Sequence, residues 1–223
     1  MPKEMSETEH DQPANVLRTR DAERTKQDIL RVAAEEFAKQ GLSGARVDAI
    51  AARTHTTKRM IYYYFGSKED LFVAVLERAY GGIREIEASM KLDRLDPETA
   101  LRRLIEFNFD YHEAHPEFVR LVMIENIHNA EHIRGSELVR QTNSPVIQVL
   151  EDILQRGYKI GVFKRQIEAR ELHMMISSLS FYRVSNRATF GVLFSIDVHA
   201  PQTREHQRRC IADSILLLMT SAG

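Results

Sequence analysis

The sequence lacks the features needed for disulfide bonds and for insertion into a membrane. Its 223 residues include one cysteine, no tryptophan, 6 prolines and 10 glycines. A single cysteine excludes an intramolecular disulfide. No apolar run approaches the roughly 20 residues of a membrane-spanning helix, and the N-terminal residues lack a signal-peptide core. We therefore expect a soluble, cytoplasmic protein.

Motifs of catalysis and metal binding are also scarce. The sequence has no glycine-rich phosphate loop, no GxSxG nucleophile and no HExxH zinc pattern. His128 and His132 stand four residues apart, a spacing compatible with a metal, but no cysteine joins them. We expect no metal and no cofactor, and a helical enzyme remains only an unfavoured alternative.

The residues that are present favour an all-helical protein. A hydrophobic content of 43% is enough for a buried core, and sustained strand alternation is absent. The net charge of −1 hides an uneven distribution, because residues 18–68 carry eleven basic and six acidic side chains, a net charge of +5. The remainder therefore carries −6, so the basic region is the part expected to face phosphates.

The most informative stretch has the pattern of two short helices around a turn. Val47, Ile50 and Ala51 are spaced by three and four residues, which places them on one face of a helix. Polar residues then interrupt the pattern, and the Thr57 hydroxyl can cap a second helix that starts near Lys58. This arrangement is typical of a helix-turn-helix.

The second short helix has two unlike faces. Ile61 and Phe65 share an apolar side, whereas the outward side is basic and phenolic. Such a face fits the major groove of DNA, where basic and hydroxyl groups can donate to guanine edges and phosphates. The residues predicted to contact DNA are Arg46, Thr57, Lys58, Arg59, Tyr62, Tyr63, Tyr64 and Lys68.

A third helix follows directly. Gly66 ends the second helix, and Ser67 with Asp70 forms a capping pattern before an apolar run. Lys68 lies in the first turn of the third helix, where the helix dipole favours an acid. A lysine there indicates a nearby phosphate, although a solvated lysine fits the sequence equally well.

Residues 41–76 resemble the DNA-binding domain of the TetR family of bacterial transcriptional repressors. The family's YxYFxSKxxL signature is present as Tyr62, Tyr64, Phe65, Ser67, Lys68 and Leu71. The resemblance is strong over residues 24–76 and architectural beyond them. Two positions depart from the family: His55 stands where a turn glycine is common, and Arg46 where a capping threonine is frequent.

The rest of the chain is interpreted as a tail and helices. We expect a disordered tail over residues 1–17, a DNA-binding domain over 18–66 and an effector-binding and dimerisation domain over 67–223. Arg18 and Arg20 could form a minor-groove arm, or belong to a flexible tail. Helices are expected over residues 21–40, 169–186 and 203–219. Three further helices are expected to start at Pro97, Pro116 and Pro145, and residues 192–198 are expected to form a loop.

The resemblance implies a small-molecule effector and a homodimer. Bulky and polar residues that could line an effector pocket, or simply form core, are Phe107, Tyr111, Phe118, Met123, Asn126, Ile127, Met174, Phe181, Tyr182 and Arg183. A buried Arg183 needs an anion, which favours an acidic or aromatic effector. Pairing of Arg183 with Glu125 or another acid would remove that argument.

Two apolar stripes are candidates for the dimer interface. They consist of Leu172, Met175, Ile176 and Leu179, and of Ile211, Ile215 and Leu218, and the alternative is ordinary core within one chain. The function predicted from the sequence is a dimeric repressor that binds a palindromic operator and responds to a ligand. The alternative is a DNA-binding regulator without a small ligand, whose C-terminal part only dimerises or binds a protein.

Overall fold

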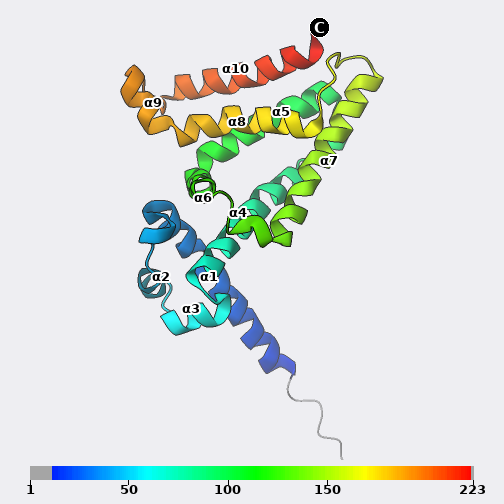
Figure 1. Ribbon diagram of the computed structural model, residues 1–223. Helices are drawn as coiled ribbons and strands as arrows, with labels where there is room; N and C mark the ends of the chain where they lie inside the picture. The colour runs from blue at the N-terminus through cyan, green and yellow to red at the C-terminus, as the bar shows by residue number, and fades with distance from the viewer. Residues whose placement is uncertain (1–11, 222–223) are drawn as a thin grey trace, which may run out of the picture. The chain divides into compact units, whose positions relative to one another are not determined.

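A computed structural model of the protein describes residues 12–221. Over this range the chain forms helices and no strand, which confirms the all-helical prediction (Figure 1). The chain divides into two compact units, the first ending at Val75 and the second beginning at Leu76. Each unit has its own core, and the two are described in turn.

The first unit contains three helices and the start of a fourth. These are α1 (Gln12–Gly44), α2 (Val47–Arg53), α3 (Lys58–Phe65) and α4 (Lys68–Ser89), whose later part belongs to the second unit. The predicted start of the first helix near residue 21 is wrong, because α1 already begins at Gln12. Residues 12–17 of the predicted tail are therefore helical, and residues 1–11 lie outside the described range.

The first unit is held together by an apolar core between α1 and the start of α4. The rings of Phe37 and Phe72 meet edge to face, with centroids 5.2 Å apart, and both side chains are fully buried. Ile61 of α3 is also fully buried. Because Leu71, Phe72 and their neighbours belong to this core, the first unit extends beyond the boundary expected at residue 66.

The caps around α4 form as the sequence indicates. Gly66 ends α3 with a φ of 89°, a conformation that glycine adopts readily. The amide of Asp70 donates to Ser67 Oγ over 2.9 Å, and the amide of Ser67 donates to Asp70 Oδ2 over 3.0 Å. This reciprocal pair satisfies two backbone donors at the start of α4.

Six further helices follow α4 in the second unit. They are α5 (Pro97–Ala114), α6 (Pro116–Ile127), α7 (Glu137–Lys159), α8 (Ala169–Ser185), α9 (Arg187–Phe194) and α10 (Pro201–Thr220). Short 3-10 turns precede α5 and α7 at Leu92–Arg94 and Ile133–Gly135. The starts of α5 and α6 confirm the helix starts predicted at Pro97 and Pro116.

The core of the second unit forms where α5 packs against α7, α8 and α10 (Figure 1). Leu101, Leu150 and Leu172 come from three of these helices, and each is fully buried in one apolar cluster. Ile215 joins the cluster from α10. A second apolar cluster lies around Tyr111 and contains residues of α4, α5, α6 and α8.

Two helix predictions for the second unit are wrong. Pro145 does not start a helix but lies inside α7, whose N-cap is Ser136, with its hydroxyl oxygen accepting from the Val139 amide. Residues 192–194, expected in a loop, are the last turn of α9. The short apolar helix α9 ends at Ser195, which has a φ of 52°.

Candidate nucleic-acid interface and interior polar residues

The turn between α2 and α3 orients the face predicted to bind DNA. His55 has a φ of 50°, so this histidine adopts the left-handed conformation that the turn requires. Thr57 then caps α3, because its Oγ1 accepts from the Met60 amide over 3.2 Å. With Ile61 fully buried, these two residues fix which side of α3 is turned outward.

The outward face of α3 is phenolic and basic. Tyr63 has 77% of its surface exposed and Tyr62 has 37%. Thr57, Lys58 and Arg59 are also exposed. Lys58 Nζ lies 3.4 Å from Asp48 Oδ2, an exposed contact that costs little to break. We call Thr57, Lys58, Arg59, Tyr62 and Tyr63 the α3 face.

The residues flanking the α3 face differ in exposure. Arg46 is exposed at the N-cap of α2 and makes no side-chain cap bond. Tyr64 is half-buried, and Lys26 of α1 lies over its ring at 5.6 Å. Phe65 is also only half-buried, although its spacing from Ile61 indicates a core position. Arg20 is exposed, and the side chain of Arg18 lies outside the described part of the structure.

Lys68 has protein partners. Its Nζ lies 3.4 Å from the carbonyl oxygen of Ser43 and 3.5 Å from that of Ala45, at the end of α1. The side chain is half-buried in this position. These contacts tie the start of α4 to the end of α1, so the lysine has a structural role in the first unit that the sequence does not indicate.

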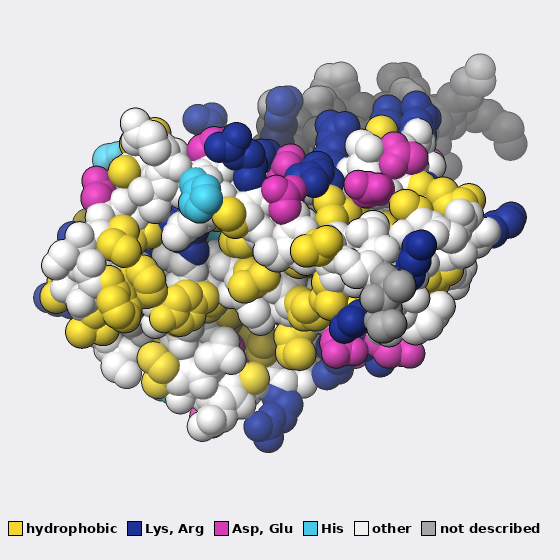
Figure 2. Space-filling model, turned by 90° about the horizontal axis from the view of Figure 1, so that it is seen from above, with side chains coloured by type: hydrophobic (Ala, Val, Ile, Leu, Met, Phe, Trp, Pro, Cys, Tyr) yellow, Lys and Arg dark blue, Asp and Glu magenta, His cyan; other side chains and the backbone are white. Residues whose placement is uncertain are grey.

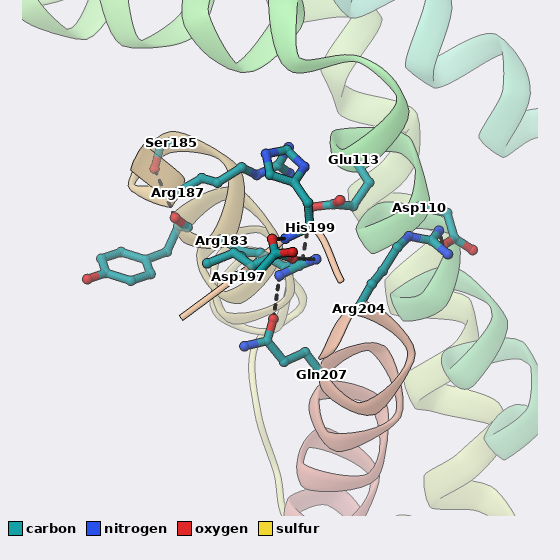
Figure 3. Close-up of polar contacts among 11 residues, drawn as sticks. Asp110, Glu113, Arg183, Ser185, Arg187, Asp197, His199, Arg204 and Gln207 are labelled. Carbon is teal, nitrogen blue, oxygen red and sulfur yellow. Dashed lines mark hydrogen bonds and ion pairs between the residues drawn. The ribbon is translucent and has the colours of Figure 1, made fainter. Parts of the chain in front are cut away.

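In the second unit, Arg183 of α8 is buried and surrounded by partners (Figure 3). Its Nε lies 3.0 Å from Oε1 of Glu113 on α5. Its two Nη atoms donate to Gln207 Oε1 over 2.5 Å and to the Val198 carbonyl over 2.8 Å. Desolvation lowers the pKa of Arg183, and the nearby Glu113 carboxylate opposes that shift.

More arginines extend this network toward α10. Arg187 also pairs with Glu113 and lies 3.5 Å from His199 Nδ1 (Figure 3). Arg208 Nε donates to Asp110 Oδ2 over 3.0 Å, and Arg204 pairs with the other oxygen of the same carboxylate. These pairs join α5 to α8, α9 and α10, and within them Arg183 and Arg187 share the single carboxylate of Glu113.

The argument for an acidic effector at Arg183 therefore fails. Burial of this arginine is as predicted, but the required anion is Glu113, which lies in the same chain. An arginine with an ionic partner and two further acceptors needs no ligand.

Eight of the ten predicted effector residues fall into two groups. Tyr111 and Phe118 are buried together, and Phe107, Met123 and Phe181 pack against them. By contrast, Ile127 is 75% exposed and Met174 is 62% exposed, and Asn126 is exposed with its amide donating to the Val122 carbonyl. These three residues lie on the solvent-facing sides of α6 and α8. They therefore cannot line an interior pocket.

A set of polar residues inside the second unit was missed by the sequence analysis. Arg84 Nε donates to Asn143 Oδ1 over 3.1 Å, and its Nη1 pairs with Oε2 of Glu87. Six buried side-chain atoms have no hydrogen-bond partner among the described residues. Two are the Nε atoms of Arg183 and Arg187, whose guanidinium groups pair with Glu113, and the other four are Glu87 Oε1, Asn108 Oδ1, His112 Nδ1 and Ser180 Oγ. The available signal was Asn108 and His112, which stand four residues apart on a helix face otherwise occupied by leucine and isoleucine.

The environment of these polar residues shifts their pKa values. Burial lowers the pKa of His112 to about 4; an interaction with the Asn108 backbone opposes this shift, and the Arg84 charge adds to it. Burial and Arg84 also lower the pKa of His173 to about 4. Desolvation raises the pKa of Glu87, against the opposing effect of Arg84. Both histidines are thus neutral at pH 7.

The predicted dimer stripes need correction. Leu172, Ile176 and Ile215 are at most 2% exposed and belong to the core of their own chain, so they cannot form an interface. Met175, Ile211 and Leu218 are half-buried, and only Leu179 is exposed as expected. Helical spacing identified an apolar side of each helix, but that side faces inward because α8 and α10 pack on α5.

A different apolar surface is exposed on α8, α9 and α10. Its members, which we call the outer apolar surface, are Met174, Leu179, Tyr182, Val192, Leu193, Phe194 and Leu217. Figure 2, a view onto the side where α10 lies in Figure 1, shows hydrophobic side chains spread over this side of the molecule. Exposed apolar patches of this kind mark interaction sites.

A shallow pocket opens between α8, α9 and α10. It has a volume of about 200 Å³ and a mainly apolar lining. The lining residues are Leu179, Tyr182, Arg183, Asn186, Arg187, Phe190, Val198, Gln207, Cys210 and Ile211. Tyr182 and Arg183 thus line this outer pocket, apart from the buried cluster around Tyr111.

One of the two histidines considered as metal ligands, His132, pairs with an acid. His132 Nδ1 lies 2.8 Å from Oε2 of the buried Glu125, and the amides of His132 and Ile133 donate to the other carboxylate oxygen. Among residues 12–221 no three His, Cys, Asp or Glu side chains are grouped as a metal site would require. Within the same range, no helix combines the length and apolar character needed to cross a membrane.

Comparison with known families matches both units. Residues 29–75 match the model described as bacterial regulatory proteins of the tetR family, and residues 97–215 match the tetracyclin repressor-like C-terminal domain. The first match spans α2, α3 and the capped start of α4. The second match begins with α5 and ends within α10.

Individual relatives agree with the family models. The chain is 38% identical over 200 residues to the HTH-type transcriptional repressor NicS of Pseudomonas putida, covering 90% of this chain and 94% of that protein. It is 33% identical over 169 residues to the HTH-type transcriptional repressor SCO4008 of Streptomyces coelicolor, covering 75% and 82%. The regulator AibR, solved with isovaleryl coenzyme A and operator DNA, matches with a TM-score of 0.63 over 89% and 100% of the chains; at 17% identity this shows the fold alone.

Proposed function

Because the chain belongs to the TetR family of bacterial regulatory proteins, we propose that it is a transcriptional repressor that binds operator DNA as a homodimer and is released by a small molecule. It is a regulator and not an enzyme. The single observation that carries the proposal is the α3 face, which presents basic and phenolic side chains to solvent at the second helix of a helix-turn-helix.

The chemistry of the α3 face suits the major groove. Lys58 and Arg59 can donate to phosphates or to guanine, and Thr57, Tyr62 and Tyr63 offer hydroxyls to phosphates. Arg46, exposed at the N-terminus of α2, is a further phosphate donor. Lys68 and Tyr64 stay in the proposal only as supporting residues, because both are half-buried against α1.

A dimer is supported by the outer apolar surface. Met174, Leu179 and Leu217 lie exposed on α8 and α10, the helices that would pair with their symmetry mates. A short recognition helix buries little surface, so two linked DNA-binding units gain affinity through effective concentration. We propose that α8 and α10 form a four-helix bundle with a second copy of the chain through these exposed residues.

A ligand response is supported by the interior of the second unit. Buried polar atoms without partners are rare in folded proteins and call for an explanation such as a missing ligand. Effector binding there would favour one conformation of the second unit, and affinity for the operator would fall by the effector's preference for that conformation.

The proposal is tested by selecting DNA duplexes that bind the full-length protein from a random pool. The selected duplexes are then analysed by footprinting. We expect a palindromic site whose half-sites are centred one or more helical turns apart, with about 34 to 36 Å per turn. Tyr63→Ala should lose this binding while keeping the wild-type melting temperature. Selection of no sequence, or protection of a lone half-site by a monomer, would contradict the proposal.

A further inference from the structure

The second unit contains a group of buried polar atoms that its own side chains leave unsatisfied. Glu87, Asn108, His112 and Ser180 are each at least nine-tenths buried. Among the described residues, one polar atom of each has no hydrogen-bond partner of standard geometry, although the Asn108 backbone also acts on the His112 ring. We call these four residues, together with Arg84 and His173, the interior polar cluster. Leaving a buried polar group unpaired costs about 1–3 kcal/mol, so four such groups need an explanation.

The members of the interior polar cluster come from three helices. Arg84 and Glu87 are on α4, Asn108 and His112 on α5, and His173 and Ser180 on α8. The Arg84 charge acts on both His112 and His173, which places the guanidinium within electrostatic range of both rings. The ring of Phe181, next to Ser180 in sequence, lies 5.9 Å from that of His112.

The charges of the cluster are already balanced. Arg84 is paired with Glu87, and its Nε is bonded to Asn143. Both histidines are neutral at pH 7 because burial lowers their pKa values to about 4. No free cation among the described members of the cluster is left for an anionic ligand, and burying an unpaired anion is costly.

The unsatisfied atoms define what a ligand must offer. Glu87 Oε1 and Asn108 Oδ1 are acceptors and need donors, whereas His112 Nδ1 and Ser180 Oγ can take either role. The surroundings are aromatic, since Tyr111 and Phe118 are buried beside His112, with ring centroids 6.4 Å and 5.7 Å from it. A flat molecule with N–H or O–H donors would fit both features.

We propose that the interior polar cluster binds an uncharged aromatic small molecule that donates hydrogen bonds, with Glu87 and Asn108 as its principal acceptors. The inference rests on the ligand response proposed above and specifies the chemical class of the ligand. It replaces the acidic effector suggested by Arg183, whose anion is Glu113.

Three probes of one shape separate the chemical classes. Benzamide is neutral and donates two hydrogen bonds, methyl benzoate is neutral and only accepts, and benzoate is an anion. Their dissociation constants for the full-length protein are measured by ligand-detected NMR titration. We expect benzamide to bind at least about tenfold more tightly than either of the others, since a hydrogen bond to a charged group is worth that much.

Matched substitutions test whether the preference for benzamide depends on the interior polar cluster. Ser180→Ala removes an unpartnered buried hydroxyl, so the free protein should keep or slightly raise its melting temperature while benzamide binds several-fold more weakly. Ser178→Ala, on the exposed side of the same helix, is the control and should change neither. Glu87→Gln should also weaken benzamide binding, but it removes the ion pair with Arg84 and should lower the melting temperature of the free protein. Its control is Glu85→Gln, at an exposed glutamate of α4, which should change neither.

The results separate this inference from the proposed function. Benzoate binding as tightly as benzamide, no binding of any probe, or cluster variants that match their controls would each overturn the inference. Operator binding is measured on the same preparations. A protein that binds its operator but fails these probe tests would keep the proposed function and lose only the ligand class.

Discussion

Two arginines of the first unit and two of the second have opposite environments. On the first unit, Arg46 and Arg59 are exposed, and neither forms an ion pair with a described residue. On the second unit, Arg183 and Arg187 are largely buried, and both pair with Glu113. The guanidinium groups of Arg46 and Arg59 are therefore available for a partner such as phosphate, whereas those of Arg183 and Arg187 join helices.

This difference shows that the type of residue does not reveal its role. A guanidinium in water keeps its charge available to a phosphate and contributes little to stability. A guanidinium in the interior must have an anion, and removing that anion leaves a buried charge unpaired. The following predictions test the contrast, beginning with the largest expected effect.

Glu113→Ala should destabilise the second unit most strongly. The substitution leaves Arg183 and Arg187 without their shared carboxylate, and breaking a buried pair costs about 3–5 kcal/mol of unfolding free energy. Urea unfolding provides the measurement. Glu137→Ala breaks the exposed pair with Arg140 and should cost at most about 1 kcal/mol. Similar losses for the two variants would remove the distinction between the buried and exposed pairs.

Ile61→Ala should destabilise the first unit by about 2–5 kcal/mol, because it empties a fully buried position under the α3 face. Phe65→Ala serves as the comparison. Since Phe65 is only half-buried, its truncation should cost clearly less. Thermal melts of both variants give the measurement, and an equal or larger loss for Phe65 would show that the assigned core side of α3 is wrong.

Acidification should destabilise the second unit through His112 and His173. Their pKa values of about 4 lie below the ordinary value of 6.5, so the unfolded chain takes up protons first as the pH falls. Each histidine then costs on the order of 3 kcal/mol of stability between pH 6.5 and 4. The raised pKa of Glu87 acts in the opposite direction, since the folded state takes up that proton more readily.

The test of this pH dependence is His112→Gln, which should flatten the fall in melting temperature between pH 6.5 and 4. His206→Gln, at an exposed position of α10, is the matched control and should leave the slope unchanged. A slope that is the same in both variants would mean that His112 is not buried in its neutral form.

Arg59→Ala should have the smallest effect on stability, within about 0.5 kcal/mol, because the side chain is exposed and unpaired. Its effect should appear in DNA binding, where loss of one phosphate contact lowers the magnitude of the salt dependence by about one. Fluorescence anisotropy with a selected operator over a range of salt concentrations measures it. An unchanged salt slope would place Arg59 outside the phosphate contacts.

The first unit could be predicted well because its signals are local. Thr57 caps α3 and Ser67 with Asp70 caps α4, and each of these motifs lies within four consecutive residues. A cap forms wherever the chain enters a helix, whatever the remaining fold. The burial of Ile61 follows from the same short pattern.

The second unit was harder to predict because its decisive contacts are distant in sequence. The partner of Arg183 is Glu113, on another helix, and no local pattern connects them. Helical periodicity places Leu172 and Met174 on different sides of α8, but it could not tell that the side of Leu172 faces the core of its own chain and the side of Met174 faces solvent. Pro145 has the local signal of a helix start, whereas the N-cap of α7 is Ser136, more than two helical turns upstream.

The continuity of α4 has a mechanical consequence. Lys68, near its first residue, is tied to the carbonyls that end α1, while Arg84 and Glu87, farther along the same helix, belong to the interior polar cluster. A helix cannot bend sharply without breaking its backbone hydrogen bonds. A ligand that contacted Glu87 would therefore act on the same continuous helix that carries Lys68.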